Sequence, residues 1–110
     1  MATVREGAQK QYKELGELLR ETTSIIDYCE IAHLADANLA PKFLIDLTRK
    51  TLDHAHAILF PYQVDWSPVK AITALDQESC RLRKVLWYIY DVQKVIMKLR
   101  LSLLVEEPVA

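Results

Sequence analysis

Apolar residues follow their longest regular pattern between Ser67 and Val105. This stretch has no glycine, and its one proline, Pro68, stands in the first turn, where a helix tolerates proline because the N–H there has no partner. Ser67 can cap the first free amides. The pattern predicts one helix over residues 68–105, interrupted only by Glu78. Its seam, in steps of three and four, is Ala71, Leu75, Leu82, Val85, Ile89, Val92, Ile96, Leu99 and Leu103.

A second amphipathic pattern predicts a helix over residues 4–36. Gly16 lies inside it at a cost of about 1 kcal/mol relative to alanine, which indicates a kink or a close approach of another helix. The inner face of this helix is expected to hold Ala8, Tyr12, Leu15, Leu19, Thr22, Ile26, Cys29 and His33.

A third helix is predicted over residues 39–60, between a turn that contains Pro41 and a stop before Pro61. Proline at position 61 moves the preceding residue away from helical angles. The expected inner face is Leu44, Ile45, Thr48, Thr51, Leu52, Ala55, Ile58 and Leu59.

Together these elements predict a single all-α domain over residues 1–110, an antiparallel bundle of three helices in the order long, short, long. At 1.5 Å per residue the helices would be roughly 50, 33 and 57 Å long, so the middle helix cannot cover the last one. Oligomerisation would then complete the core. The alternative is a four-helix bundle, formed if the last helix breaks near residues 76–79.

The uncovered end of the last helix is the predicted oligomer interface, and a dimer is the favoured form because two-fold symmetry is the commonest. Burying several large apolar side chains there could outweigh the entropy cost of association. The predicted interface residues are Ile96, Met97, Leu99, Leu101, Leu103 and Leu104.

The net charge of −1 argues against a strongly basic nucleic-acid clamp, although it hides an uneven distribution. Residues 1–37 carry four basic and seven acidic residues, and residues 67–110 carry seven basic and five acidic ones. No signal peptide or membrane-spanning run is recognised, and two cysteines without paired spacing suit a reducing compartment. We therefore expect a cytoplasmic protein without membrane association.

A basic stripe on the last predicted helix offers a different function, because it could follow a phosphate backbone. It consists of Arg81, Arg83, Lys84, Tyr88, Lys94 and Lys98, with Asp91 in the middle. Arg81-Leu82-Arg83 followed by Asp91 resembles the small helical subunits of reverse-transcriptase retroelements, and the size and all-helical character are also similar to those of subunits of RNA-guided complexes. The resemblance implies an RNA- or DNA-binding accessory subunit.

Two enzymatic or metal-binding interpretations rest on histidines. Arg49 and His54 have the Arg-x4-His spacing of HEPN-type ribonucleases, which they resemble, but Lys50 stands where that family usually has Asn, Asp or His. Glu30 and His33 have the i, i+3 spacing of di-iron bundles, which need two such pairs, and only one occurs. Asp53, His54, His56 and Glu78 complete the set of candidate ligands, for which the alternative is ordinary structural and surface roles.

Three further residues receive structural assignments. Glu78 is the one charge in the apolar seam and is expected to pair with Arg49. Cys29 continues the seam of the first helix and should face the core, whereas Cys80 should be exposed among polar neighbours.

The sequence therefore favours a non-enzymatic interaction module that associates with itself first and with a larger protein second. No metal or cofactor is expected, since no phosphate loop, nucleophile elbow or paired-cysteine motif is present. The alternative is the nucleic-acid-binding subunit, and a ribonuclease or metal-binding bundle comes third.

Overall fold

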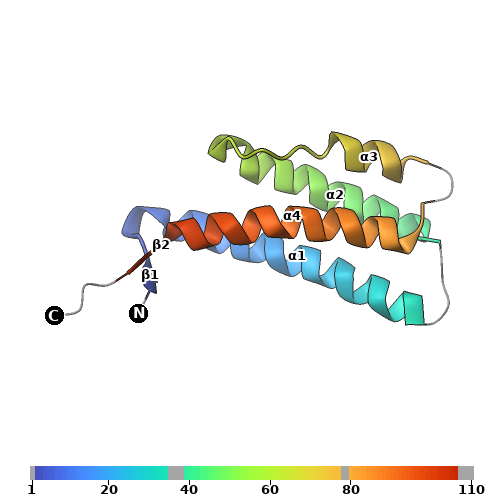
Figure 1. The fold of residues 1–110 in the computed structure, drawn as a ribbon, viewed down its shortest axis with the longest axis horizontal. Coiled ribbons are helices and arrows are strands. Elements are labelled where there is room, and N and C mark those ends of the chain that lie inside the picture. Colours follow the sequence, from blue (N-terminus) through green and yellow to red (C-terminus); the bar gives the residue numbers. More distant parts are fainter. Residues whose placement is uncertain (1, 35–38, 78–79, 107–110) are drawn as a thin grey trace.

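Helix α1 (Gln9–Leu34) and helix α4 (Leu82–Leu103) lie side by side and antiparallel, and they form the most extensive contact in the fold (Figure 1). The computed structural model describes residues 2–34, 39–77 and 80–106. Helix α2 (Lys42–Leu59) and the short helix α3 (Val69–Leu75) complete the bundle. Short 3-10 turns, η1 (Glu6–Ala8) and η2 (Phe60–Tyr62), precede α1 and follow α2. The predicted all-α class is confirmed.

The predicted single helix over residues 68–105 is wrong, because the chain reverses direction between Leu75 and Leu82 (Figure 1). The backbone N–H of Ala40 donates to the carbonyl oxygen of Cys80 at 2.9 Å, which holds the reversal beside the start of α2. Leu75, Cys80 and Leu82 are all buried in one core on the two sides of this reversal. The described chain is thus the alternative four-helix bundle, with its third helix shortened.

This break also removes the length argument for oligomerisation. Helix α4 has 22 residues and α2 has 18, so they differ by roughly 6 Å at 1.5 Å per residue. The ends of α1 and α4 reach past α2 together and cover each other (Figure 1). Any case for self-association must therefore rest on exposed surface.

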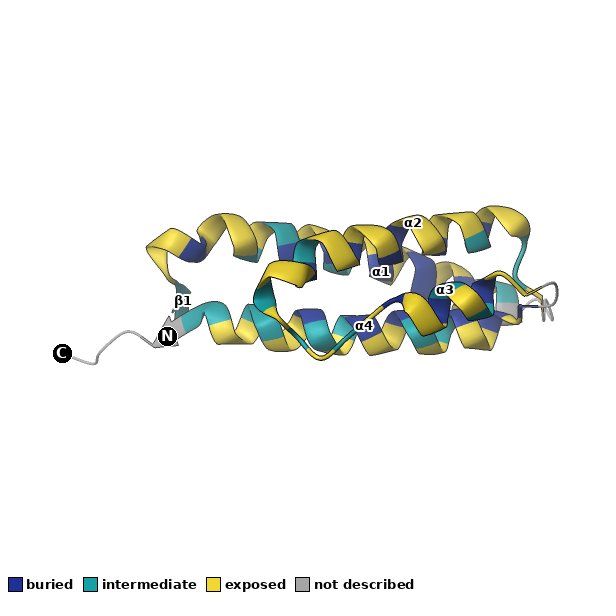
Figure 2. Cartoon of the chain, turned by 90° about the horizontal axis from the view of Figure 1, so that it is seen from above, coloured by how far each residue is buried: buried dark blue, intermediate teal, exposed yellow. Residues whose placement is uncertain are grey.

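The predicted inner faces form the core, and Figure 2 shows buried residues turned toward neighbouring helices and exposed ones turned outward. Two of the buried threonines donate to their own helices: the hydroxyl of Thr22 donates to the carbonyl oxygen of Leu18 at 3.1 Å, and that of Thr48 to the carbonyl oxygen of Leu44 at 2.7 Å. The largest fully buried side chains are Leu15, Leu18, Ile25, Leu44, Leu52, Leu59, Leu75, Leu82, Ile89, Ile96, Val85 and Val92.

Two short strands tie the ends of the described chain together. Strand β1 (Ala2–Val4) pairs antiparallel with strand β2 (Leu104–Glu106), with Val4 opposite Leu104. Val4 was predicted to lie in the first helix and Leu104 in the last, and both predictions are wrong. The end of α2 at Leu59 lies one residue from the predicted end, but Phe60 keeps helical angles (φ −53°, ψ −45°) and begins η2, so the expected effect of Pro61 on Phe60 is wrong.

The two cysteines are both buried, so the prediction for Cys29 is confirmed and the one for Cys80 is wrong. Cys80 turns inward because it belongs to the reversal between α3 and α4. Burial raises the pKa of Cys29 to about 11, with smaller contributions from the nearby Cys80 and Glu30. Burial also raises the pKa of Cys80, against the opposing effect of Lys84.

Candidate functional site

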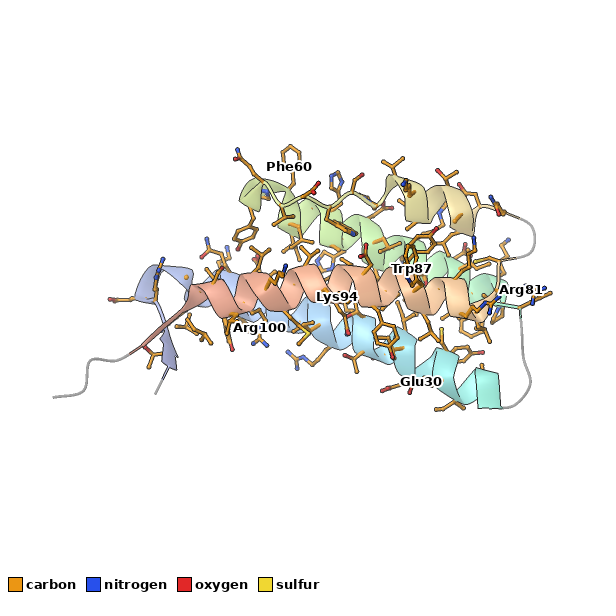
Figure 3. All side chains as sticks on the ribbon, in the orientation of Figure 1. Glu30, Phe60, Arg81, Trp87, Lys94 and Arg100 are labelled. Atoms are coloured by element: carbon orange, nitrogen blue, oxygen red, sulfur yellow. The ribbon has the colours of Figure 1, made fainter. Side chains whose placement is uncertain are left out.

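The outer face of α4 combines large apolar side chains with cations, and it is the candidate functional site. Trp87, Met97 and Leu101 are 66%, 58% and 70% exposed, although such residues are usually buried. Arg83, Lys84, Lys94 and Lys98 are exposed on the same helix. Figure 3 labels Trp87 and Lys94 along this helix, with Arg100 on the side toward α1. We call the set of Arg83, Lys84, Trp87, Lys94, Met97, Lys98 and Leu101 the α4 face.

Near the start of α4, the α4 face carries an aromatic pair beside two cations. The rings of Trp87 and Tyr88 meet edge to face, with centroids 5.1 Å apart. Together with Arg83 and Lys84 they line a surface hollow of about 370 Å³. A flat aromatic surface flanked by positive charge can contact a planar or an anionic group.

Near the end of α4, the two sets of residues predicted for different functions interleave. A shallow hollow of about 620 Å³ is lined by Asp91, Lys94, Val95, Met97, Lys98 and Leu101. Met97 and Leu101 come from the predicted oligomer interface, and Lys94 and Lys98 from the predicted nucleic-acid stripe. The structure thus joins both candidate sites on one surface.

The remaining predicted interface residues are covered by the chain itself. Ile96 is 0% exposed and belongs to the core, so it offers no surface to a second copy. Leu99 and Leu103 are partly buried against the core, and Leu104 opens strand β2. In the predicted basic stripe, Arg81 is exposed just before α4, whereas Tyr88 is partly buried.

The predicted partner of Arg49 lies outside the described residues, since Glu78 is not among them. Arg49 instead pairs with Asp76 at the end of α3, with 2.7 Å between Nη1 and Oδ1. Both side chains are about half exposed, so this is a surface ion pair. The pair of Arg49 with Glu78 stays a prediction.

Among the described residues, the histidines do not lie in the arrangements that a ribonuclease site or a metal site would need. Arg49 reaches α3, while the Nδ1 atom of His54 lies 3.1 Å from Glu21 Oε2 on α1, so the two side chains of the ribonuclease spacing turn to different neighbours. Within residues 2–34, 39–77 and 80–106, no three His, Cys, Asp or Glu side chains cluster as a metal site would require. The side chain of His33 and all of Glu78 lie outside that description.

Two groups of exposed apolar side chains, one on the α4 face and one elsewhere, were not predicted from the sequence. Trp87 lies off the seam that runs through Val85 and Ile89, so its helical position already indicated an outward direction. Between α1 and α2, Tyr28 and Phe43 pack their rings edge to face at 5.2 Å and remain exposed, and Ile31 on α1 is 69% exposed.

Comparison of the chain with protein-family models, with curated proteins and with solved structures finds no match. No helix in the described ranges combines the length and the apolar content needed to cross a lipid bilayer.

Proposed function

We propose that this chain is a non-enzymatic helical module that associates with a second copy of itself through the α4 face, and with a larger protein as its second partner. The observation that supports this most is the row of Trp87, Met97 and Leu101, which is exposed while the seam of the same helix through Val85 and Ile89 is buried. Exposed apolar surface of this kind usually marks a binding site.

A two-fold arrangement suits the order of residues along α4. If two α4 helices pair antiparallel about an axis midway between Lys94 and Val95, positions at equal distances from that point face each other. Asp91 of one copy then meets Lys98 of the other. Trp87 and Leu101 are also nearly equidistant from the axis, so each indole would pack beside the other copy's leucine.

The energetics of such a contact favour a dimer of moderate affinity. A large apolar side chain contributes roughly 1.5–3 kcal/mol when it is fully buried. A two-fold contact buries each of Trp87, Met97 and Leu101 twice, and these gains compete with an association cost of about 4–15 kcal/mol. Lys94 near the axis can lay its aliphatic stem on this surface while its ammonium group stays in water.

Light scattering of the eluting protein over a wide concentration range tests the proposal. A mass that rises from one to two chains with concentration is expected. A single-chain mass at the highest concentration would contradict self-association through this face.

A second candidate function is binding of single-stranded nucleic acid, and the Trp87–Tyr88 pair beside Arg83 and Lys84 favours it. Aromatic rings stack on unpaired bases, and neighbouring cations contact the phosphates. Fluorescence anisotropy with a labelled single-stranded RNA, repeated at increasing salt, tests this candidate.

A further inference from the structure

A second charged site lies in the groove between α1 and the last turns of α4, on the flank of α4 that faces α1. The guanidinium of Arg100 stacks on the ring of Tyr12, with 3.9 Å between its central carbon and the ring centroid. Gly16 makes this approach possible, since a Cβ at that position would lie 3.0 Å from Arg100 Nη2. Figure 3 shows Arg100 on this side of α4.

The charge of Arg100 has no compensating group in the part of the chain that the structure describes. Its Nε atom is shielded from solvent and makes no hydrogen bond. The two ion pairs among the described residues involve Arg49 and His54, which lie on α2. A guanidinium held in place by an aromatic ring and without a carboxylate partner is set up to bind an external anion.

Other side chains that line the groove also favour binding of an anion. Lys13 and Arg20 from α1 line it together with Arg100, and this open groove has a volume of about 830 Å³. Within the described chain, no acidic side chain is among its lining residues. The hydroxyl oxygen of Thr23, also on the lining, accepts from Gln93 Nε2 at 3.1 Å, so its own O–H hydrogen remains free to donate to a ligand.

We propose that this groove binds the phosphate group of a small phosphorylated molecule. Three cations suit an anion with two or more charges better than a single carboxylate, and a guanidinium matches the oxygen geometry of phosphate. The volume corresponds to a small-molecule ligand, for which pockets usually measure about 300–1,000 Å³. This site uses residues outside the α4 face and does not depend on self-association.

Isothermal titration of the full chain with inorganic pyrophosphate, at constant ionic strength set with chloride, tests the proposal. Arg100→Gln should weaken binding by about tenfold or more, and Arg20→Gln by several-fold, because each removes one charge-assisted contact. Lys50→Gln is the matched control, since it removes an exposed cation of α2 that does not line the groove. Its affinity for pyrophosphate should equal that of the wild-type chain.

Three results would overturn the proposal. These are no binding of pyrophosphate, an equal loss of affinity in Lys50→Gln, and binding of a single-stranded oligonucleotide without binding of pyrophosphate. Arg20 is exposed, so Arg20→Gln decides the question if Arg100→Gln fails to fold. Gly16→Ala gives an independent readout, because its added methyl group would push Arg100 Nη2 and should also weaken binding.

Discussion

The Arg49 guanidinium on α2 lies 2.7 Å from the Asp76 carboxylate, at the point where α3 ends and the chain turns toward α4. Both side chains are about half exposed, so water screens the pair. The ion pair therefore lies at the reversal of the chain, where the described fold departs from the predicted single long helix.

Replacing Arg49 should therefore change stability only slightly. We expect Arg49→Gln to lower the free energy of unfolding by less than about 1 kcal/mol, as exposed ion pairs do. Urea denaturation followed by circular dichroism measures this, with Lys50→Gln, an exposed cation on the same helix, as the control. A loss of about 3–5 kcal/mol would instead indicate a buried partner for Arg49.

Substitutions at Leu101 and at Ile31, a matched position outside the α4 face, test the proposed dimer. Leu101 and Ile31 are equally exposed, but Ile31 lies on α1, outside the α4 face. Leu101→Lys should shift the protein to single chains at concentrations where the wild-type chain is dimeric, whereas Ile31→Lys should leave the mass unchanged. Sedimentation velocity distinguishes the two outcomes. Dissociation by both variants would mean that the contact lies elsewhere.

The proposed register makes a sharper prediction about charge. Asp91→Lys should weaken the dimer, because two lysines would then face each other at each end of the contact. Adding Lys98→Asp restores opposite charges, so the double variant should regain most of the affinity. Failure of the double variant to recover, with both variants folded, would exclude this register.

Trp87 is the residue on which the nucleic-acid candidate depends most. Trp87→Ala should weaken binding of single-stranded RNA by about tenfold, since stacking of one base contributes roughly 1–3 kcal/mol. Phe60→Ala is the control, because Phe60 is a similarly exposed aromatic residue in the turn η2. Anisotropy titrations in which both variants behave alike would argue against stacking on Trp87.

The buried thiol of Cys29 predicts how stability depends on pH. Its pKa in the folded chain is raised to about 11 from an ordinary value of 9.0, mainly by burial, so folding favours the neutral thiol. This contribution is fully present below pH 9 and is lost as pH rises toward 11, by roughly 2–3 kcal/mol in total. The free energy of unfolding of Cys29→Ala should therefore fall less steeply over this interval. Parallel slopes for the variant and the wild-type chain would show that Cys29 is not desolvated.

Apolar periodicity predicted the faces of the helices better than their ends. The seam through Val85, Ile89 and Val92 is buried as expected, because a helix fixes which positions share a face. The break after Leu75 left only a weak signal in the sequence, the charge of Glu78 within the seam. No glycine or proline lies between Leu75 and Leu82 to indicate a break. The reversal is stabilised by contacts distant in sequence, such as the hydrogen bond from Ala40 to Cys80, and apolar periodicity does not show these contacts.

The candidate sites were predictable to different degrees, because spacing along one helix can be read from the sequence and packing between helices cannot. Exposed positions on one helix, such as Trp87 and Lys94, follow from spacing along that helix. The groove around Arg100 depends on how α1 and α4 pack, which brings Tyr12 beside a residue far along the chain. Only Gly16 gave a sequence signal there, as a place where something could approach α1 closely.

The pairing of the first and last helices also constrains how the chain can be made. Because α1 packs mainly against α4, the apolar side of α1, with Leu15 and Leu18, has only the smaller contact with α2 as native cover until α4 has left the ribosome. Helices α2 and α3 can form a small local unit earlier. Part of the apolar side of α1 therefore stays uncovered during synthesis, and folding is completed by a contact between distant parts of the sequence.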